Sequence, residues 1–162
     1  MSTKTESHSV PFRGSHEPPR RPTGESEAGA SSRRPWYWEG SIQARLATYL
    51  AGRGYKICSV AHTASKEHGI DIVAAGPDGV EIWISVKGFP ESSANTQARH
   101  WFAQAVFDVA LCRSQNASVR LALGLPDGFP TYERLASRIG WLRTTLPLTI
   151  YWVGRSGAIR EE

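Results

Sequence analysis

One stretch constrains the fold more than any other part of the chain: Gly69 to Gly88, which reads GIDIVAAGPDGVEIWISVKG. Two short apolar runs flank Pro77-Asp78-Gly79, a combination typical of a tight turn, because proline presets φ and glycine tolerates the left-handed conformation. The pattern therefore predicts two β-strands joined by a three-residue hairpin loop. A loop of that length pairs Asp71 with Ser85 across the two strands.

Side chains alternate between the two faces of a strand, so this register sorts the hairpin residues into two sets. One set is apolar throughout and must face a core: Ile72, Ala74, Val80, Ile82, Ile84 and Val86. The other set is partly polar. In it, Glu81 lies near the hairpin tip and is predicted to face solvent, whereas Asp71, Ser85 and Lys87 gather at the opposite end. That end is where the hairpin can carry chemistry.

Asp71 and Lys87 point the same way from adjacent strands, which suits two different roles. A carboxylate can hold Mg²⁺ through one or two oxygens, and a neighbouring lysine can orient a water molecule that the metal acidifies. The alternative is an ordinary cross-strand ion pair, worth from a few tenths to about 1 kcal/mol. Spacing alone leaves both roles open.

The segment Gly69-Ile70-Asp71-Ile72, then the hairpin, then Ile84-Ser85-Val86-Lys87-Gly88, resembles the core of the PD-(D/E)XK nuclease superfamily, in particular its Holliday-junction-resolvase and Mrr-type members. Asp71 matches the aspartate of the superfamily and Lys87 matches its lysine. The resemblance implies a restriction-endonuclease-like α/β fold, Mg²⁺ or Mn²⁺ bound by Asp71, hydrolysis of DNA and a homodimer. Ser85 departs from the pattern, because the superfamily has an acidic residue or glutamine there.

A helix is predicted to begin near Glu39, because Glu39, Ile42, Leu46 and Leu50 share one helical stripe and Gly52 offers a stop. An acidic residue aligned with a core-facing stripe has two interpretations. In resolvase-like families a glutamate on the first helix reaches the metal, and Glu39 matches that place as a second metal-binding carboxylate. Alternatively, Glu39 only stabilises the helix N-terminus through the macrodipole.

The remaining elements follow from the same periodicities. Strands are predicted at Tyr55–His62, Val119–Leu125 and Leu148–Val153, and helices at about Thr96–Arg113 and Tyr132–Leu142. The longer of these helices has a buried stripe made by Ala98, Phe102, Ala105, Val109 and Cys112. The order of elements reproduces the αβββαβ core of the nuclease superfamily, followed by a C-terminal helix-strand extension. It predicts a central mixed sheet flanked by helices.

The predicted helix after the hairpin also carries candidate substrate-binding residues. Gln97-x-x-x-Trp101 resembles the Gln-x-x-x-Tyr motif of some superfamily members, which implies that both residues line the substrate groove. The alternative is a packing tryptophan and an ordinary polar residue of the first turn. Arg99 and His100 on the same helix, and Lys66 in the loop that leads into the hairpin, are predicted to contact phosphate.

The whole chain, at 162 residues, suits one domain of ordinary size. Residues 1–35 are polar and lack periodicity, so they are predicted to form a disordered tail, and residues 36–162 the nuclease-like domain. A net charge of +4 permits a nucleic-acid partner without requiring one. Cys58 and Cys112 lie in apolar segments, and no membrane span or signal peptide is apparent. The prediction is a cytoplasmic protein with buried thiols and no membrane partner.

Three functions stay open on the sequence alone. The first is a metal-dependent nuclease that acts on DNA, with Asp71, Glu39, Lys87 and Ser85 in its catalytic centre. The second is a catalytically inactive nucleic-acid-binding module on the same fold, which the loss of the acidic residue at Ser85 suggests. The third is a protein-interaction domain with an exposed apolar patch. The tryptophans considered for that patch are Trp36, Trp38, Trp83 and Trp101.

Overall fold

The computed structural model describes residues 34–62 and 70–162. These residues belong to one folded unit, Arg34–Glu162. The predicted tail lies outside the described residues as far as residue 33, and Lys66, a predicted phosphate contact, lies outside them as well.

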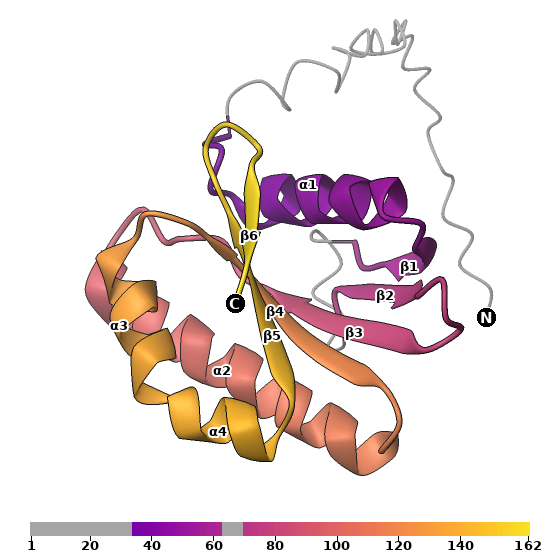
Figure 1. The fold of residues 1–162 in the computed structure, drawn as a ribbon. Helices are drawn as coiled ribbons and strands as arrows, with labels where there is room; N and C mark the ends of the chain where they lie inside the picture. Colours follow the sequence, from indigo (N-terminus) through magenta and orange to yellow (C-terminus); the bar gives the residue numbers. More distant parts are fainter. Residues whose placement is uncertain (1–33, 63–69) are drawn as a thin grey trace, which may run out of the picture. The chain divides into compact units, whose positions relative to one another are not determined.

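At the centre of this unit is a six-stranded mixed β-sheet in which the strands lie in sequence order (Figure 1). The second strand is antiparallel to both the first and the third, the third, fourth and fifth are parallel, and the sixth returns antiparallel to the fifth. The strands are β1 (Lys56–Val60), β2 (Ile72–Ala75), β3 (Glu81–Val86), β4 (Arg120–Pro126), β5 (Leu148–Val153) and β6 (Ile159–Glu161). The predicted mixed sheet is confirmed.

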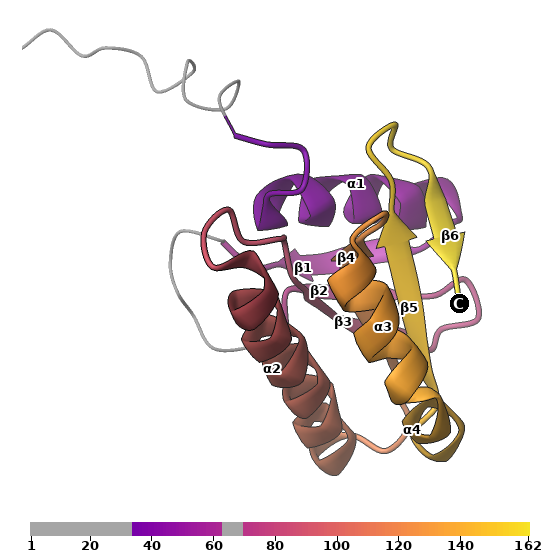
Figure 2. The same ribbon diagram turned by 90° about the vertical axis from the view of Figure 1, so that its left-hand side faces the viewer.

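Helices cover both faces of the sheet, one face by a single helix and the other by three (Figures 1 and 2). The helices are α1 (Glu39–Gly52) on the first face, and α2 (Ala94–Gln115), α3 (Pro130–Arg138) and α4 (Gly140–Thr145) on the second. Each face has its own apolar cluster of buried residues. Because both faces are covered, the central strand β4 is buried from Leu121 onward, as its apolar sequence predicts. Within the described ranges, no helix is long and apolar enough to cross a membrane.

The hairpin of β2 and β3 has the predicted register. Val73 pairs with Trp83, and Gly79 has a φ of +80°, the left-handed conformation that closes the three-residue loop. The backbone N–H of Asp71 donates to the Ile84 carbonyl at 3.0 Å, which extends the pairing so that Asp71 lies opposite Ser85. The apolar face is buried against α1 through Ile72, Ala74, Ile82, Ile84 and Val86.

The helix predicted at Tyr132–Leu142 is wrong in its extent, because the structure has two helices there. Pro130 occupies the first turn of α3, where its fixed φ and missing N–H are tolerated, so the helix begins two residues early. At Ile139 the backbone leaves helical geometry, with φ −100° and ψ 15°, and α4 begins at Gly140. The apolar periodicity continues across the break, and therefore the sequence pattern concealed it.

The C-terminal segment forms the edge strand β6, an element that the periodicities do not predict. Gly157, with a φ of +90°, turns the chain back so that Ile159–Glu161 pairs with β5. The side chain of Glu162 then accepts a hydrogen bond from Trp152 Nε1 at 2.8 Å. A strand of three residues with two charged side chains has no apolar pattern, so only its backbone and side-chain bonding reveal it.

The two cysteines differ in exposure. Cys112, on the buried stripe of α2, is 5% exposed, which confirms the prediction for that thiol. Cys58 is exposed, so the prediction that it is buried is wrong. The reason is the position of β1 at the edge of the sheet, where all its residues except Ile57 are exposed.

Candidate active site

The hairpin register brings Asp71 and Lys87 together at the end of β3. Lys87 Nζ lies 3.8 Å from Asp71 Oδ2, and the two side chains are only 13% and 14% exposed. An ion pair so shielded from water is more strongly coupled than one on the surface. The predicted pairing of these two residues is therefore present in the structure.

The carboxylate of Asp71 is held in place by the strand opposite. The backbone N–H of Val86 donates to Asp71 Oδ2 at 2.6 Å, and Ser85 Oγ donates to the same oxygen at 3.4 Å. Burial raises the pKa of Asp71, while Lys87, the Val86 N–H and the Ser85 hydroxyl act to lower it. Burial is the largest of these effects. The protein thus fixes a carboxylate in a place where its charged form is costly.

Ser85 has a different place from the one expected of a metal ligand. Its side chain is fully buried, and its hydroxyl points at Asp71. It therefore orients the carboxylate and has no solvent-facing oxygen. Ser85, which departs from the superfamily pattern, thus helps to hold the Asp71 carboxylate in place.

Glu39 belongs to the same group of charges. Burial raises the pKa of Glu39, and the nearby Asp71 charge raises it further, whereas Lys87 and the backbone N–H of Gly88 lower it. Glu39 is the first residue of α1, so the N-terminus of that helix is directed at the end of the hairpin. We refer to Asp71, Lys87 and Glu39 together as the acidic cluster.

Gly88 allows α1 to approach the end of β3 closely. A Cβ atom at this position would lie 2.6 Å from the Glu39 nitrogen and 2.7 Å from the Tyr37 oxygen, both backbone atoms that cannot yield easily. The Gly88 carbonyl accepts a hydrogen bond from Tyr132 Oη at 2.7 Å, deep in the core. The glycine after the lysine therefore sets how near Glu39 comes to Lys87.

Gln43 is a structural support that the sequence reasoning missed. Its side chain is buried, and Nε2 donates to the backbone carbonyls of Ala61 and Asp71, both at 3.1 Å. It ties α1 to the segments that end β1 and begin β2. The signal was available in the sequence, because Gln43 lies one turn after Glu39 on the core-facing side of the helix.

Among the described residues, no hydrogen bond or ion pair joins the substrate-binding residues predicted on α2 to the acidic cluster. Gln97, Arg99 and His100 are exposed, and Trp101 is half-buried. The α2 residue that does act on the cluster is Asp108, whose charge raises the pKa of Asp71. Arg99 instead lines a cavity with two arginines of α3, which sequence reasoning did not connect with it.

The four tryptophans considered for a protein partner are not among the exposed large apolar residues of the described ranges. All four tryptophans are half-buried. Trp36 packs against Tyr37 and Phe129, and Trp83 donates its indole N–H to Glu81 at 2.9 Å. Glu81, expected to face solvent, is correspondingly only partly exposed. The large apolar residues that are exposed among the described ones are Val60, Phe107, Leu111 and Trp141.

A divalent metal is compatible with the acidic cluster only as a site with two carboxylates. In residues 34–62 and 70–162, no three His, Cys, Asp or Glu side chains gather as a metal-binding group. Mg²⁺ is commonly bound through one or two carboxylates, with water and substrate phosphate completing its octahedron. Asp71 and Glu39 are two partly buried carboxylates with raised pKa values, and a cation between them would favour their charged forms.

No family model, curated protein or solved structure matches this chain. Two carboxylates and an ammonium group, held on rigid elements and shielded from water, can bind a cation and steer a water molecule toward a phosphate.

Proposed function

We propose that this protein is a metal-dependent nuclease that hydrolyses DNA phosphodiester bonds on a restriction-endonuclease-like core. Two features support the fold proposal. The elements α1, β1, β2, β3, α2 and β4 follow one another in the αβββαβ order. The mixed sheet has its antiparallel hairpin beside parallel central strands, with the acidic cluster at the end of β3.

The observation that carries the functional proposal is the shielded Asp71–Lys87 pair with Glu39 beside it. Asp71 and Glu39 would hold Mg²⁺ or Mn²⁺, which supplies an acidified water and offsets charge on the phosphate. Lys87 orients the attacking water and stabilises the negative charge that develops on the phosphate oxygens. Ser85 and the Val86 N–H keep the Asp71 carboxylate fixed throughout.

A second function, a nucleic-acid-binding module without catalysis, is favoured by one observation. The buried Ser85 hydroxyl stands where an acidic residue would add a third carboxylate ligand. The cluster therefore offers a metal only the carboxylates of Asp71 and Glu39 among the described residues. This function predicts DNA binding that weakens as salt rises, because basic side chains release counterions from the phosphates, with no hydrolysis under any divalent metal.

Calorimetric titration with Mn²⁺ separates the two functions. We expect the wild type to bind Mn²⁺ and Asp71→Asn to lose that binding, since asparagine keeps a hydrogen-bond acceptor for Val86 but removes the charge. Asp78→Asn is the matched control, because Asp78 lies at the other end of the same hairpin, paired with Arg120 on the surface. Cleavage of linear and branched DNA is then measured with the same three proteins.

Mn²⁺ binding that disappears in Asp71→Asn and persists in Asp78→Asn, together with cleavage that follows the same pattern, supports the nuclease. Absence of Mn²⁺ binding by the wild type in the presence of DNA contradicts it. Salt-sensitive DNA binding without cleavage would then assign the protein to the binding function.

A further inference from the structure

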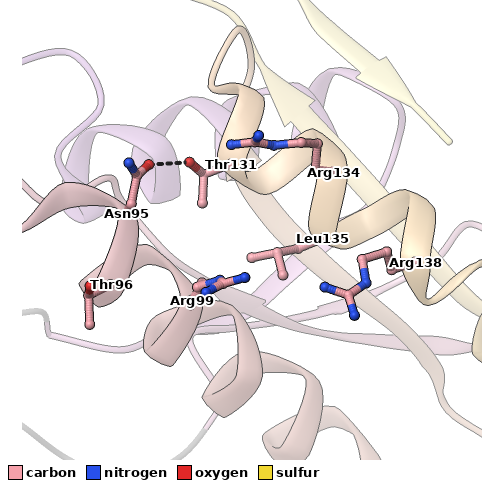
Figure 3. A pocket seen from close by; sticks show the side chains of 7 residues that line it. All are labelled: Asn95, Thr96, Arg99, Thr131, Arg134, Leu135 and Arg138. Atoms are coloured by element: carbon pink, nitrogen blue, oxygen red, sulfur yellow. Dashed lines mark hydrogen bonds between the residues drawn. The ribbon is translucent and has the colours of Figure 1, made fainter.

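A second charged region lies between the N-terminal half of α2 and the length of α3. It is a cavity of about 430 Å³, which we call the arginine pocket. Figure 3 shows the side chains that line it, with Arg99 extending from α2 toward Arg138 of the facing helix, and Arg134 lying nearer the start of α3, at the Thr131 end. The lining residues are Asn95, Thr96, Arg99, Thr131, Arg134, Leu135 and Arg138.

The helical repeat explains why three arginines meet here. Thr131, Arg134 and Arg138 are spaced by three and four residues, so they share the face of α3 that is turned to α2. Asn95 and Arg99 are likewise one turn apart on α2. Thr131 is buried and its hydroxyl lies 2.7 Å from Asn95 Oδ1, a hydrogen bond that joins the beginnings of the two helices. This hydrogen bond therefore fixes α3, which carries Arg134 and Arg138, relative to α2, which carries Arg99.

The positive charge of the pocket is not balanced within the described part of the chain. No Asp or Glu lines the pocket, and none of its three arginines forms a salt bridge. Other arginines do have carboxylate partners, among them Arg120 with Asp78 and Arg143 with Glu162. Three guanidinium groups that face one cavity repel one another unless an anion lies between them.

The helix ends add to this charge. The first turns of both α2 and α3 contribute to the lining, and neither helix has a side-chain hydrogen bond at its N-cap. The partial positive charge of each helix N-terminus thus adds to that of the arginines. This contribution supplements the guanidinium groups, which are the main source of positive charge.

We propose that the arginine pocket binds a phosphate monoester. Guanidinium groups present paired N–H donors that match the oxygens of a phosphate, and three of them suit a group that carries close to two negative charges. A phosphodiester carries one charge and fits this surplus less well. The source of the monoester is either a small phosphate ester or the 5′-phosphate at the end of a nucleic acid. The inference does not rest on the proposed nuclease activity, because no residue of the acidic cluster lines the pocket.

Inorganic phosphate and adenosine 5′-monophosphate, with adenosine as the uncharged comparison, are the first probes. Binding is followed on the full chain by calorimetry and by the arginine Nε–Hε signals in NMR. We expect binding to weaken at least tenfold in the double variant Arg99→Gln, Arg138→Gln, and the Arg99 and Arg138 signals to shift in the wild type. Arg155→Gln is the matched control, an exposed arginine in the β5–β6 turn that forms no ion pair with another described residue.

Equal phosphate binding by the wild type and the double variant would overturn the proposal, as would an equal loss in Arg155→Gln. A glutamate-rich peptide that binds the pocket more tightly than adenosine 5′-monophosphate would also overturn it, because the pocket would then belong to a protein partner. Asp71→Asn must bind phosphate like the wild type, so failure of the nuclease proposal leaves this result unaffected.

The same variants distinguish the two sources of the monoester. An oligonucleotide with a 5′-phosphate is compared with the same oligonucleotide carrying a 5′-hydroxyl. Tighter binding of the phosphorylated one, lost in the double arginine variant, identifies recognition of nucleic-acid ends. Equal binding of the two oligonucleotides, with adenosine 5′-monophosphate still bound in the pocket, identifies a small phosphate ester. Both results support a phosphate site.

Discussion

The acidic cluster and the arginine pocket place charge in opposite ways. In the cluster, Asp71 and Lys87 are close, shielded and held by hydrogen bonds, so each charge has a partner within the protein. In the pocket, Arg99 and Arg138 are exposed and lack an acidic partner among the described residues. The acidic cluster fixes the positions of its charged groups, but its burial costs free energy because these groups lose hydration. The arginine pocket keeps its charges hydrated and ready for an anion from outside.

The largest effect is expected when the cluster loses its only cation. Lys87→Ala should reduce DNA cleavage by about 100- to 1,000-fold or more, because it removes the group that stabilises charge in the transition state. Cleavage rates on linear DNA with Mg²⁺ measure this, with circular dichroism to show that the fold is retained. Phosphate binding in the arginine pocket should be unchanged.

Arg120→Ala serves as the control for that experiment, since it breaks an exposed ion pair at the other end of the hairpin. It should leave cleavage within about twofold of the wild type, because an exposed ion pair contributes little. Cleavage retained by Lys87→Ala would remove the lysine from the mechanism, and the cluster would then be a structural ion pair.

The next largest effect tests how closely α1 must approach the cluster. Gly88→Ala places a Cβ atom against backbone atoms of Glu39 and Tyr37, at 2.6 and 2.7 Å. We expect a loss of about 1–3 kcal/mol in the free energy of unfolding, together with loss of Mn²⁺ binding as Glu39 is displaced. Urea denaturation and calorimetry measure the two effects.

The control for Gly88→Ala is Gly52→Ala at the end of α1, where a Cβ atom meets nothing within 4 Å. This change should be neutral or stabilise the protein by up to about 1 kcal/mol, because alanine restricts the unfolded chain. Equal stability of the two variants would mean that the close approach at Gly88 does not position Glu39.

A smaller effect tests whether the two charged regions are coupled. Tyr132 is fully buried on α3, the helix of the arginine pocket, and its hydroxyl bonds the Gly88 carbonyl next to Lys87. Tyr132→Phe should lower the free energy of unfolding by about 1 kcal/mol, since a buried carbonyl loses its donor. Tyr49→Phe, which loses an exposed hydrogen bond to Glu161, should cost less. If Tyr132→Phe changes phosphate binding but not cleavage, the hydrogen bond positions only the pocket.

The same contrast explains what could be predicted from the sequence. Asp71, Ser85 and Lys87 belong to one hairpin, and its turn residues fix the register, so their proximity follows from strand periodicity. The buried stripes of α1 and α2 follow from helical periodicity in the same way. Local spacing was sufficient for these residues, which share one element or two adjacent ones.

The arginine pocket could not be predicted, because it depends on how α2 packs against α3. Arg99 and Arg138 are far apart in the sequence, and each alone resembles an ordinary surface arginine. Gln43 was missed for a related reason, since its acceptors are the backbone carbonyls of the residue after β1 and the residue before β2, which only the fold brings near. The break at Ile139 and the strand β6 have no apolar pattern that marks them.

The smallest effect concerns stability and its dependence on pH. The pKa of Glu39 is raised above its ordinary value of 4.5, mainly by burial. The folded state therefore binds this proton more tightly than the unfolded chain, so the contribution of Glu39 to stability is highest below pH 4.5 and is lost as pH rises through the higher pKa of the folded state. Glu39→Gln removes this pH-dependent loss of stability, because the glutamine side chain carries no charge. We expect the variant to match the wild type near pH 4 and to exceed it by a few tenths of a kcal/mol at pH 7, because solvent screens a partly exposed carboxylate. Arg138→Gln, at an exposed position in the pocket, is the control and should change stability by the same small amount at both pH values. Urea denaturation at pH 4 and pH 7 measures the free energy of unfolding of both variants.

A Glu39→Gln effect that is the same at both pH values would contradict this prediction. It would show that the Glu39 carboxylate is as well solvated as the arginines of the pocket, and the difference in solvation between the two charged regions would disappear.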